Sequence, residues 1–183
     1  MNAVEFPPQA RTPELPIIGS VQFDNSSSRP VSAGRNRDGR VYLLAEDSEN
    51  DAFLTERAFR ASDISDPLHV VADGDAAIAF LRGAEPYQNR EEYPRPDVVL
   101  LDLGLPGKSG FEVLSWMRAQ PDLDAVIIII LTASNREADA DRAYELGANF
   151  YLTKPGNFEE LVRMTQCLHR WMPANHFSTQ VGH

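Results

Sequence analysis

Five short apolar runs alternate with longer amphipathic segments along residues 40–171, and this alternation constrains the fold more than any other feature. The runs cover residues 41–45, 68–72, 98–101, 126–131 and 149–152. The segments that follow them predict helices near residues 48–62, 74–82, 109–119, 135–146 and 157–171. Five strand-helix units in succession predict an α/β protein with helices on both faces of a parallel sheet.

Single positions within these units support the same architecture. The run from Ile127 to Leu131 shows no polar alternation, which is typical of a central strand covered on both faces. Gly147 stands where a helix end favours a positive φ, and Ser109 and Ser134 are predicted helix N-caps. Residues 82–96 are polar and contain prolines, so we expect an exposed connection before the third strand.

The two ends of the chain differ from this pattern. Residues 1–36 contain five prolines, a run of three serines and no sustained apolar periodicity. They predict a disordered or loosely packed N-terminal arm, followed by one domain at residues 37–172 and a flexible C-terminal tail at residues 173–183. A short docking segment built on the apolar residues of the arm is a second interpretation of residues 1–36.

The charge of the chain limits its partners. The formal net charge is -10, and residues 1–36 are balanced, so the negative excess lies in residues 37–183. Such a surface repels phosphate backbones, so we expect no direct nucleic-acid binding and favour proteins or a cation as partners. No apolar stretch is long enough to cross a membrane and no signal peptide is evident, so the expected location is the cytoplasm. The single cysteine, Cys167, lies in an apolar helical segment that predicts simple packing.

Polar side chains follow four of the five predicted strands. Glu46 and Asp47 end the first strand, Asp102 the third, Thr132 the fourth and Lys154 the fifth. Each residue alone has an ordinary interpretation as a helix cap, a turn residue or a solvated side chain. Because the carboxyl ends of parallel strands meet at one edge of the sheet, where ligands bind in such folds, their joint occurrence predicts a site.

The chemistry of these groups points to phosphoryl transfer. Two carboxylates about 4 Å apart repel by roughly 4 kcal/mol at an effective dielectric near 20, so three of them together require a cation. Oxygen ligands of this kind suit Mg²⁺. Lys154 and Thr132 suit the oxygens of a transferring phosphoryl group, and Asp102 is then the nucleophile that forms an aspartyl phosphate.

Four ordered motifs extend this prediction to a family, because residues 40–171 closely resemble the receiver domain of two-component response regulators. The motifs are Leu43-Leu44-Ala45-Glu46-Asp47, Leu100-Leu101-Asp102-Leu103-Gly104-Leu105-Pro106-Gly107, Leu131-Thr132-Ala133-Ser134 and Tyr151-Leu152-Thr153-Lys154-Pro155. The resemblance implies a flavodoxin-like, doubly wound sheet of five parallel strands in the order 2-1-3-4-5, a fold for which a receiver is a known example.

The resemblance also implies a role for each carboxylate. Asp102 is expected to accept a phosphoryl group from a phosphohistidine of a sensor histidine kinase. Asp47 is expected to bind Mg²⁺ directly and Glu46 through water, with Asp102 and the backbone carbonyl of Gly104 completing the protein ligands. Gly104 lacks the side chain that influences dephosphorylation at this position in the family.

Three further residues receive roles from the same resemblance. Thr132 and Lys154 are expected to hold the phosphoryl oxygens. Tyr151 occupies the aromatic switch position, where the ring moves as Thr132 is drawn toward the phosphoryl group. A half-buried strand aromatic without a switch role is the alternative interpretation of Tyr151.

These expectations describe a stand-alone response regulator that catalyses only its own phosphorylation and dephosphorylation. Few residues follow the receiver, so the expected output is a protein interaction, with homodimerisation through the fourth helix, fifth strand and fifth helix. The long loop before the third strand and the Leu-Pro-Gly-Lys turn are similar to regulators that partner phytochrome-like kinases.

Two other functions stay open at this point. An aspartyl-nucleophile phosphatase also carries an aspartate after a parallel strand, but it needs a second acid two residues later, where this chain has Gly104. A degenerate receiver that serves as a constitutive scaffold is the third interpretation, although no element of the acceptor site is missing.

Overall fold

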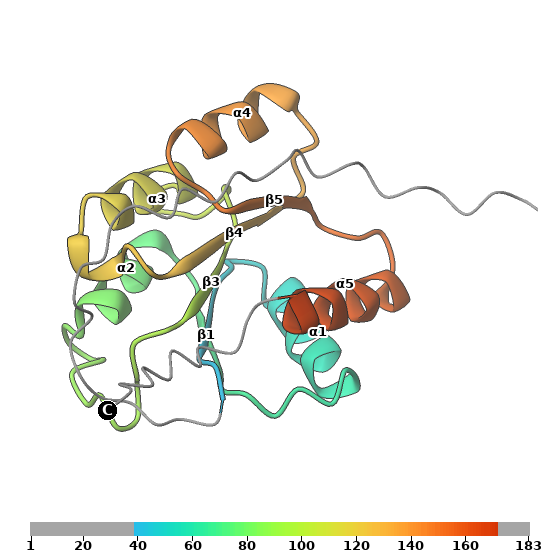
Figure 1. The fold of residues 1–183 in the computed structure, drawn as a ribbon, viewed down its shortest axis with the longest axis horizontal. Helices are drawn as coiled ribbons and strands as arrows, with labels where there is room; N and C mark the ends of the chain where they lie inside the picture. Colours follow the sequence, from blue (N-terminus) through green and yellow to red (C-terminus); the bar gives the residue numbers. More distant parts are fainter. Residues whose placement is uncertain (1–38, 172–183) are drawn as a thin grey trace, which may run out of the picture. The chain divides into compact units, whose positions relative to one another are not determined.

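The computed structural model describes residues 39–171, so the predicted arm at residues 1–36 and the predicted tail at residues 173–183 lie outside the described residues. The elements follow one another as strand-helix units (Figure 1). In chain order they are β1 (Tyr42–Ala45), α1 (Glu49–Ala61), β2 (Leu68–Val71), α2 (Gly74–Arg82), β3 (Val98–Leu101), α3 (Gly110–Arg118), the 3-10 helix η1 (Pro121–Leu123), β4 (Ile127–Thr132), α4 (Glu137–Glu145), β5 (Phe150–Thr153) and α5 (Phe158–Trp171).

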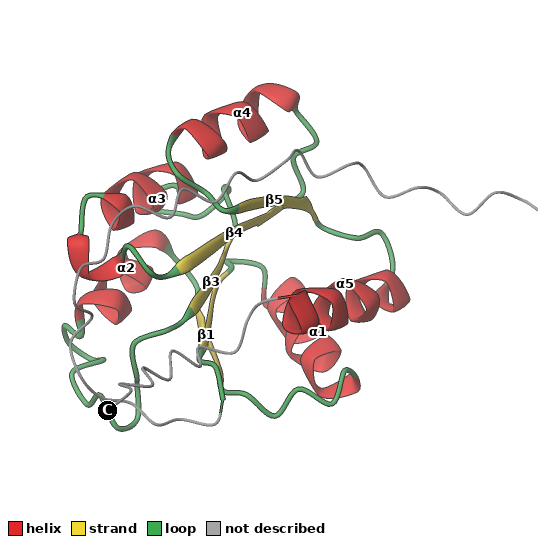
Figure 2. Cartoon of the chain, viewed as in Figure 1, coloured by secondary structure: helices red, strands yellow, loops and turns green. Residues whose placement is uncertain are grey.

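The described strands form one parallel sheet in the order β2-β1-β3-β4-β5, which confirms the predicted fold class (Figure 2). Neighbouring strands are in close register at their carboxyl ends, because Ala45 lies opposite Leu101 and Thr132 lies opposite Thr153. The residues that follow β1, β3, β4 and β5 therefore meet at one edge of the sheet, as the sequence predicts.

Helices cover both faces of the sheet. Figure 1 shows α1 and α5 together on one side and α2 and α3 on the other, with α4 beside β5. One core cluster joins Tyr42 and Leu44 to Phe59 of α1, and the other joins Leu43 and Val99 to residues of α2, α3 and α4. Alternate side chains of a strand thus enter different cores, which explains why the central strands are apolar throughout.

Local signals set most helix ends. Ser109 caps α3 as predicted, in a capping box in which its side chain and that of Glu112 bind each other's backbone N–H. Gly147, just after α4, has the predicted positive φ of 95°. Ser48 caps α1 and Asp73 caps α2, in both cases by accepting a backbone N–H of the first turn.

Three predictions about local structure need correction. Ser134 is not an N-cap, because α4 begins only at Glu137 and the Ser134 hydroxyl bonds to the Asp139 carboxylate instead. Cys167 is exposed, because α5 buries Leu161 and Thr165 along one stripe and Cys167 falls outside it. The connection after α2 is not simply exposed either.

That connection carries two half-buried tyrosines. The rings of Tyr87 and Tyr93 lie 5.1 Å and 6.0 Å from the ring of the buried Phe80, and 5.3 Å from each other. Apolar contact of this kind holds the segment against α2, although its proline and polar composition predicted only a loop.

Candidate functional site

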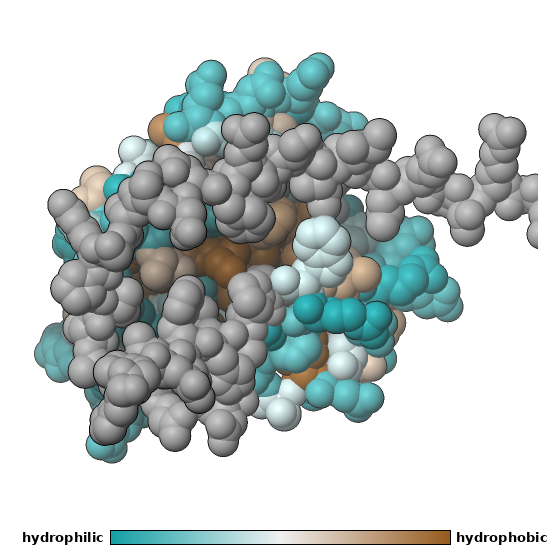
Figure 3. Space-filling model, in the orientation of Figure 1, coloured by the Kyte–Doolittle hydropathy of each residue, from teal (hydrophilic) through white to brown (hydrophobic). Residues whose placement is uncertain are grey.

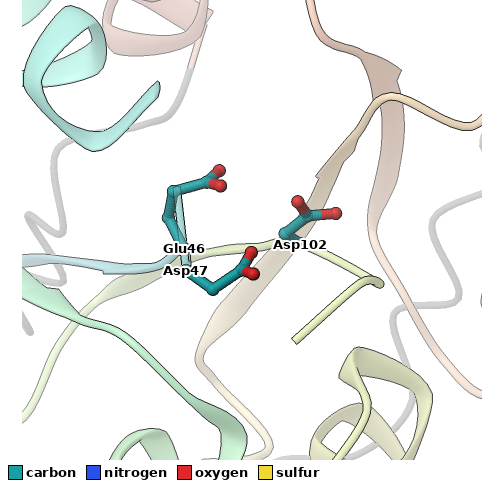
Figure 4. A group of neighbouring side chains, drawn as sticks. All are labelled: Glu46, Asp47 and Asp102. Carbon is teal, nitrogen blue, oxygen red and sulfur yellow. The ribbon is translucent and has the colours of Figure 1, made fainter. Parts of the chain in front are cut away.

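Glu46, Asp47 and Asp102 converge at the carboxyl edge of the sheet. Each offers a carboxylate oxygen, and these oxygens all lie within 4.8 Å of one another (Figure 4). Glu46 and Asp102 are buried and Asp47 is exposed. This set of hard oxygen ligands, open to solvent on one side, fits a divalent cation such as Mg²⁺ that keeps part of its water.

Lys154 is the counter-charge to these carboxylates. Its backbone N–H donates to the carbonyl of Thr132, which extends the β4-β5 pairing to the residue after β5. Its Nζ lies 2.6 Å from Glu46 Oε2 and 2.7 Å from Asp102 Oδ2. Burial alone would lower the pKa of Lys154, but the hydrogen bonds from its ammonium to the carboxylates outweigh burial and raise the pKa. Lys154 is therefore charged at neutral pH.

Asp51 is the third carboxylate around Lys154, and sequence reasoning did not select it. Its Oδ2 lies 2.9 Å from Lys154 Nζ, and it stands in the first turn of α1, a few residues after Asp47. An acid in the first turn of a helix is ordinarily explained by the helix dipole. The only available signal was its position just after the predicted ligand pair.

The pKa values of the two buried carboxyls are shifted in opposite directions. At Asp102, burial raises the pKa, but the Lys154 ammonium, the Gly104 N–H at 3.2 Å and the Thr132 hydroxyl together lower it below the usual value. At Glu46, burial is the largest effect and keeps the pKa raised despite Lys154. Asp102 is therefore the more strongly ionised of the two, as a nucleophile requires.

Thr132 and Tyr151 meet at the backbone of Ser134. The buried Thr132 hydroxyl accepts a hydrogen bond from the Ser134 N–H at 3.3 Å. The Tyr151 hydroxyl donates to the Ser134 carbonyl at 3.1 Å, and the half-buried Tyr151 ring packs against the core on the α3 side. The two predicted switch residues thus share one neighbour, which sequence reasoning did not identify.

Gly104 lies at the open side of the site. It is exposed, and a Cβ added there would meet no atom of the described residues within 4 Å. Glycine is therefore not required by a close contact. The second acid of an aspartyl-nucleophile phosphatase would fit at this position, and the chain does not carry it.

Comparison with known proteins identifies the family. The family model of the response regulator receiver domain matches residues 42–166. This chain belongs to the response regulator receiver family. As a receiver it is a phosphorylatable regulator of two-component signalling, a system in which receivers work with histidine kinases.

Individual relatives of this receiver are known. Response regulator Rcp1 of Synechocystis sp. is 42% identical over 127 residues, which are 69% of this chain and 84% of Rcp1. A crystal structure of Rcp1 in its Mn²⁺-bound form superimposes with a TM-score of 0.65 at 40% identity, over 74% of this chain and 99% of that chain. The phosphorylated cyanobacterial phytochrome response regulator RcpA gives a TM-score of 0.66 at 34% identity, over 71% and 91%.

These findings confirm the family and fold predicted from the sequence motifs. The individual roles of all the predicted site residues stay predictions; these residues are Glu46, Asp47, Asp102, Gly104, Thr132, Tyr151 and Lys154. No helix within residues 39–171 is long and apolar enough to cross a membrane.

Proposed function

We propose that this chain is a stand-alone response regulator in which Asp102 accepts a phosphoryl group from a phosphohistidine of a sensor histidine kinase. The observation that carries the proposal is the contact between the Lys154 ammonium and the buried, ionised Asp102 carboxylate at 2.7 Å. The carboxylate is ionised, as a nucleophile must be, and the ion pair fixes its position for attack on an electron-poor phosphorus atom.

The residues of the site divide the chemical step between them. An Asp102 oxygen forms a new bond to phosphorus while the phosphorus-nitrogen bond of the donor breaks, and the electron pair of that bond returns to the histidine ring. Lys154, which contacts Asp102 before the reaction, and Thr132, whose hydroxyl helps to lower the pKa of Asp102, then bind the phosphoryl oxygens. Because these donors are in place beforehand, little reorganisation accompanies the transfer.

Mg²⁺ is the proposed cation, held by Glu46, Asp47, Asp102 and the backbone carbonyl of Gly104. The carboxylate oxygens within 4.8 Å of one another fit such an ion, and the similar Rcp1 has been crystallised with Mn²⁺. The ion supplies positive charge that offsets the charge of the transferring phosphoryl oxygens. Removal of divalent ions with a chelator should stop phosphorylation, and added Mg²⁺ should restore it.

Phosphorylation of Asp102 is tested directly with a radiolabelled histidine kinase or a small phosphodonor. We expect the wild-type chain to take up one phosphoryl group as a base-labile acyl phosphate. Asp102→Asn should take up none, whereas Asp141→Asn, which removes an exposed acid from α4, should be labelled like the wild type. Equal labelling of Asp102→Asn would contradict the proposal.

The proposed donor is a phytochrome-like histidine kinase. The support is the similarity to RcpA, whose name describes it as a phytochrome response regulator. Phosphotransfer from a phytochrome-like kinase should be at least tenfold faster than from a histidine kinase with an unrelated sensor domain. Equal rates would restrict the proposal to histidine kinases in general.

The proposed output is a change of the surface formed by α4, β5 and α5, which controls association with a second copy or another protein. Sedimentation of the full chain with and without Mg²⁺ and beryllofluoride, which mimics the phosphoryl group, tests the first alternative. An unchanged sedimentation coefficient would contradict phosphorylation-dependent dimerisation and leave another protein as the partner.

A further inference from the structure

Helix α4 has little packing of its own. Within the described part of the chain only Ala143 of α4 is fully buried, whereas α3 buries Gly110, Val113, Leu114 and Met117. The outward surface of α4, at the top of Figure 3, is mostly hydrophilic. Burial of apolar surface therefore fixes the position of α4 only weakly, and its polar contacts must contribute more.

The carboxyl end of α4 is anchored to its surroundings. Arg118 of α3 donates from Nε to the Gly147 carbonyl and from a terminal nitrogen to Asn149 Oδ1, both at 2.8 Å. The Tyr144 hydroxyl, in the last turn of α4, accepts the Tyr151 N–H of β5 at 3.2 Å. These bonds tie the end of α4 to α3 and to the start of β5.

The amino end of α4 is held in a different way. Its N-cap residue, Arg136, makes no side-chain hydrogen bond to the helix in the described region. Instead, the Ser134 hydroxyl donates to Asp139 Oδ2 in the first turn at 2.6 Å and accepts the Arg136 N–H at 3.3 Å. Ser134 therefore holds the first turn of α4 from outside the helix.

Ser134 also contacts both predicted switch residues, through its backbone rather than its side chain. Its N–H donates to Thr132 and its carbonyl accepts the Tyr151 hydroxyl. The Thr132 hydroxyl also helps to lower the pKa of Asp102. The acceptor site is thus connected to α4 through Thr132, the backbone of Ser134 and the hydrogen bond from the Ser134 side chain to Asp139.

We propose that the hydrogen bond between Ser134 and Asp139 is the link by which the acceptor site positions α4. When Thr132 moves toward a phosphoryl group, Ser134 moves with it, and the first turn of α4 follows while the end anchored by Arg118 stays in place. Ser134 and Asp139 are positioning residues, and the proposal rests on the phosphorylation of Asp102 proposed above.

The experiment measures amide hydrogen exchange of the full chain by mass spectrometry, with and without Mg²⁺ and beryllofluoride. Ser134→Ala removes the hydroxyl and keeps the backbone bonds to Thr132 and Tyr151. Asp139→Ala removes the acceptor. Glu137→Ala, which removes another acid from the first turn, controls for the loss of charge near the helix dipole, and Ser134→Thr restores a hydroxyl.

Without the analogue, Ser134→Ala and Asp139→Ala should each speed exchange about tenfold in peptides at the amino end of α4, because a bond to a charged acceptor is lost. The double variant should exchange about as fast as either single variant, because both substitutions remove the same hydrogen bond. Glu137→Ala should change exchange by less than about threefold, and Ser134→Thr should restore slow exchange. If Glu137→Ala and Asp139→Ala speed exchange equally, the hydrogen bond between Ser134 and Asp139 does not position α4.

With the analogue, the wild-type chain should show altered exchange at the amino end of α4 and unaltered exchange around Gly147. Ser134→Ala should still bind the analogue, because its backbone bonds to Thr132 and Tyr151 stay in place, yet lose the altered exchange in α4. A wild-type response of α4 in Ser134→Ala would overturn the inference and leave the proposed function intact. Failure of the wild-type chain to bind the analogue at Asp102 would overturn both.

Discussion

Helices α3 and α4 have equal lengths of nine residues and pack against the same core, but they are held in opposite ways. α3 has a capping box and four buried residues, so its own sequence determines where it lies. α4 has no side-chain cap within the described residues and one buried residue, and its first turn is bound by a residue of the candidate site. The helix that packing fixes least is therefore the one connected to the predicted switch residues.

Substitutions in the core should distinguish the two helices most strongly. Met117 of α3 is fully buried, so Met117→Ala should lower the free energy of unfolding by about 2–5 kcal/mol through lost apolar burial and a cavity. Ala143→Gly in α4 should cost about 1 kcal/mol, mainly through helix propensity. Urea unfolding of both variants gives the two values. If Ala143→Gly lowers the free energy of unfolding more than Met117→Ala does, burial does not distinguish the two helices.

Arg118 connects α3 to the residues that follow α4. Arg118→Ala should lower the free energy of unfolding by about 2 kcal/mol, because the carbonyls of Gly147 and Val126 lose a charged donor in a part-buried position. Limited proteolysis should also show faster cleavage after α4 but no change at α3. Cleavage that rises equally in both helices would mean that Arg118 stabilises the domain in general and does not anchor α4.

Substitutions at the helix caps should change the stability by a smaller amount, with a loss at α3 and a gain at α4. Ser109→Ala should destabilise the chain by about 1 kcal/mol, because α3 loses its capping box. Arg136→Asp places a capping side chain at α4 and should stabilise the chain by about 0.5–1 kcal/mol. Thermal unfolding measures both changes. If Arg136→Asp gives no stabilisation, Ser134 already satisfies the first turn of α4.

Most of the fold and the position of the site were predictable from the sequence, because they depend on patterns that repeat. Apolar runs ending in polar residues defined the strands, and the shared direction of parallel strands brought Asp102, Thr132 and Lys154 to one edge. Residue types indicated phosphoryl transfer, and the resemblance to receivers added the predicted role of each residue. A strand that is buried on both faces leaves few alternative interpretations of its composition.

The contacts that the sequence did not predict depend on tertiary packing. Ser134 was predicted to cap the fourth helix because serine is a common N-cap, yet its hydroxyl bonds to Asp139. Asp51 has the ordinary position of an acid in a first turn, and only the placement of Lys154 makes it part of the site. Cys167 lies among apolar neighbours in the chain but outside the stripe that α5 buries. In each case the local pattern fits two structures, and the packing of the folded chain decides between them.

The smallest expected effect is a pH dependence at the capping box of α3. The hydrogen bonds from Ser109 to Glu112 hold the pKa of Glu112 below its usual value. Between the two pKa values the unfolded chain binds more protons than the folded chain, so the capping box stabilises the domain above the unfolded pKa. This contribution is lost as pH falls through the folded pKa. The difference in melting temperature between the wild type and Glu112→Gln should therefore shrink from about pH 6 to about pH 3. The control is Glu137→Gln, which removes an acid from the first turn of α4 without removing a capping box; an equal effect there would show that the helix dipole, and not the capping box, causes the change.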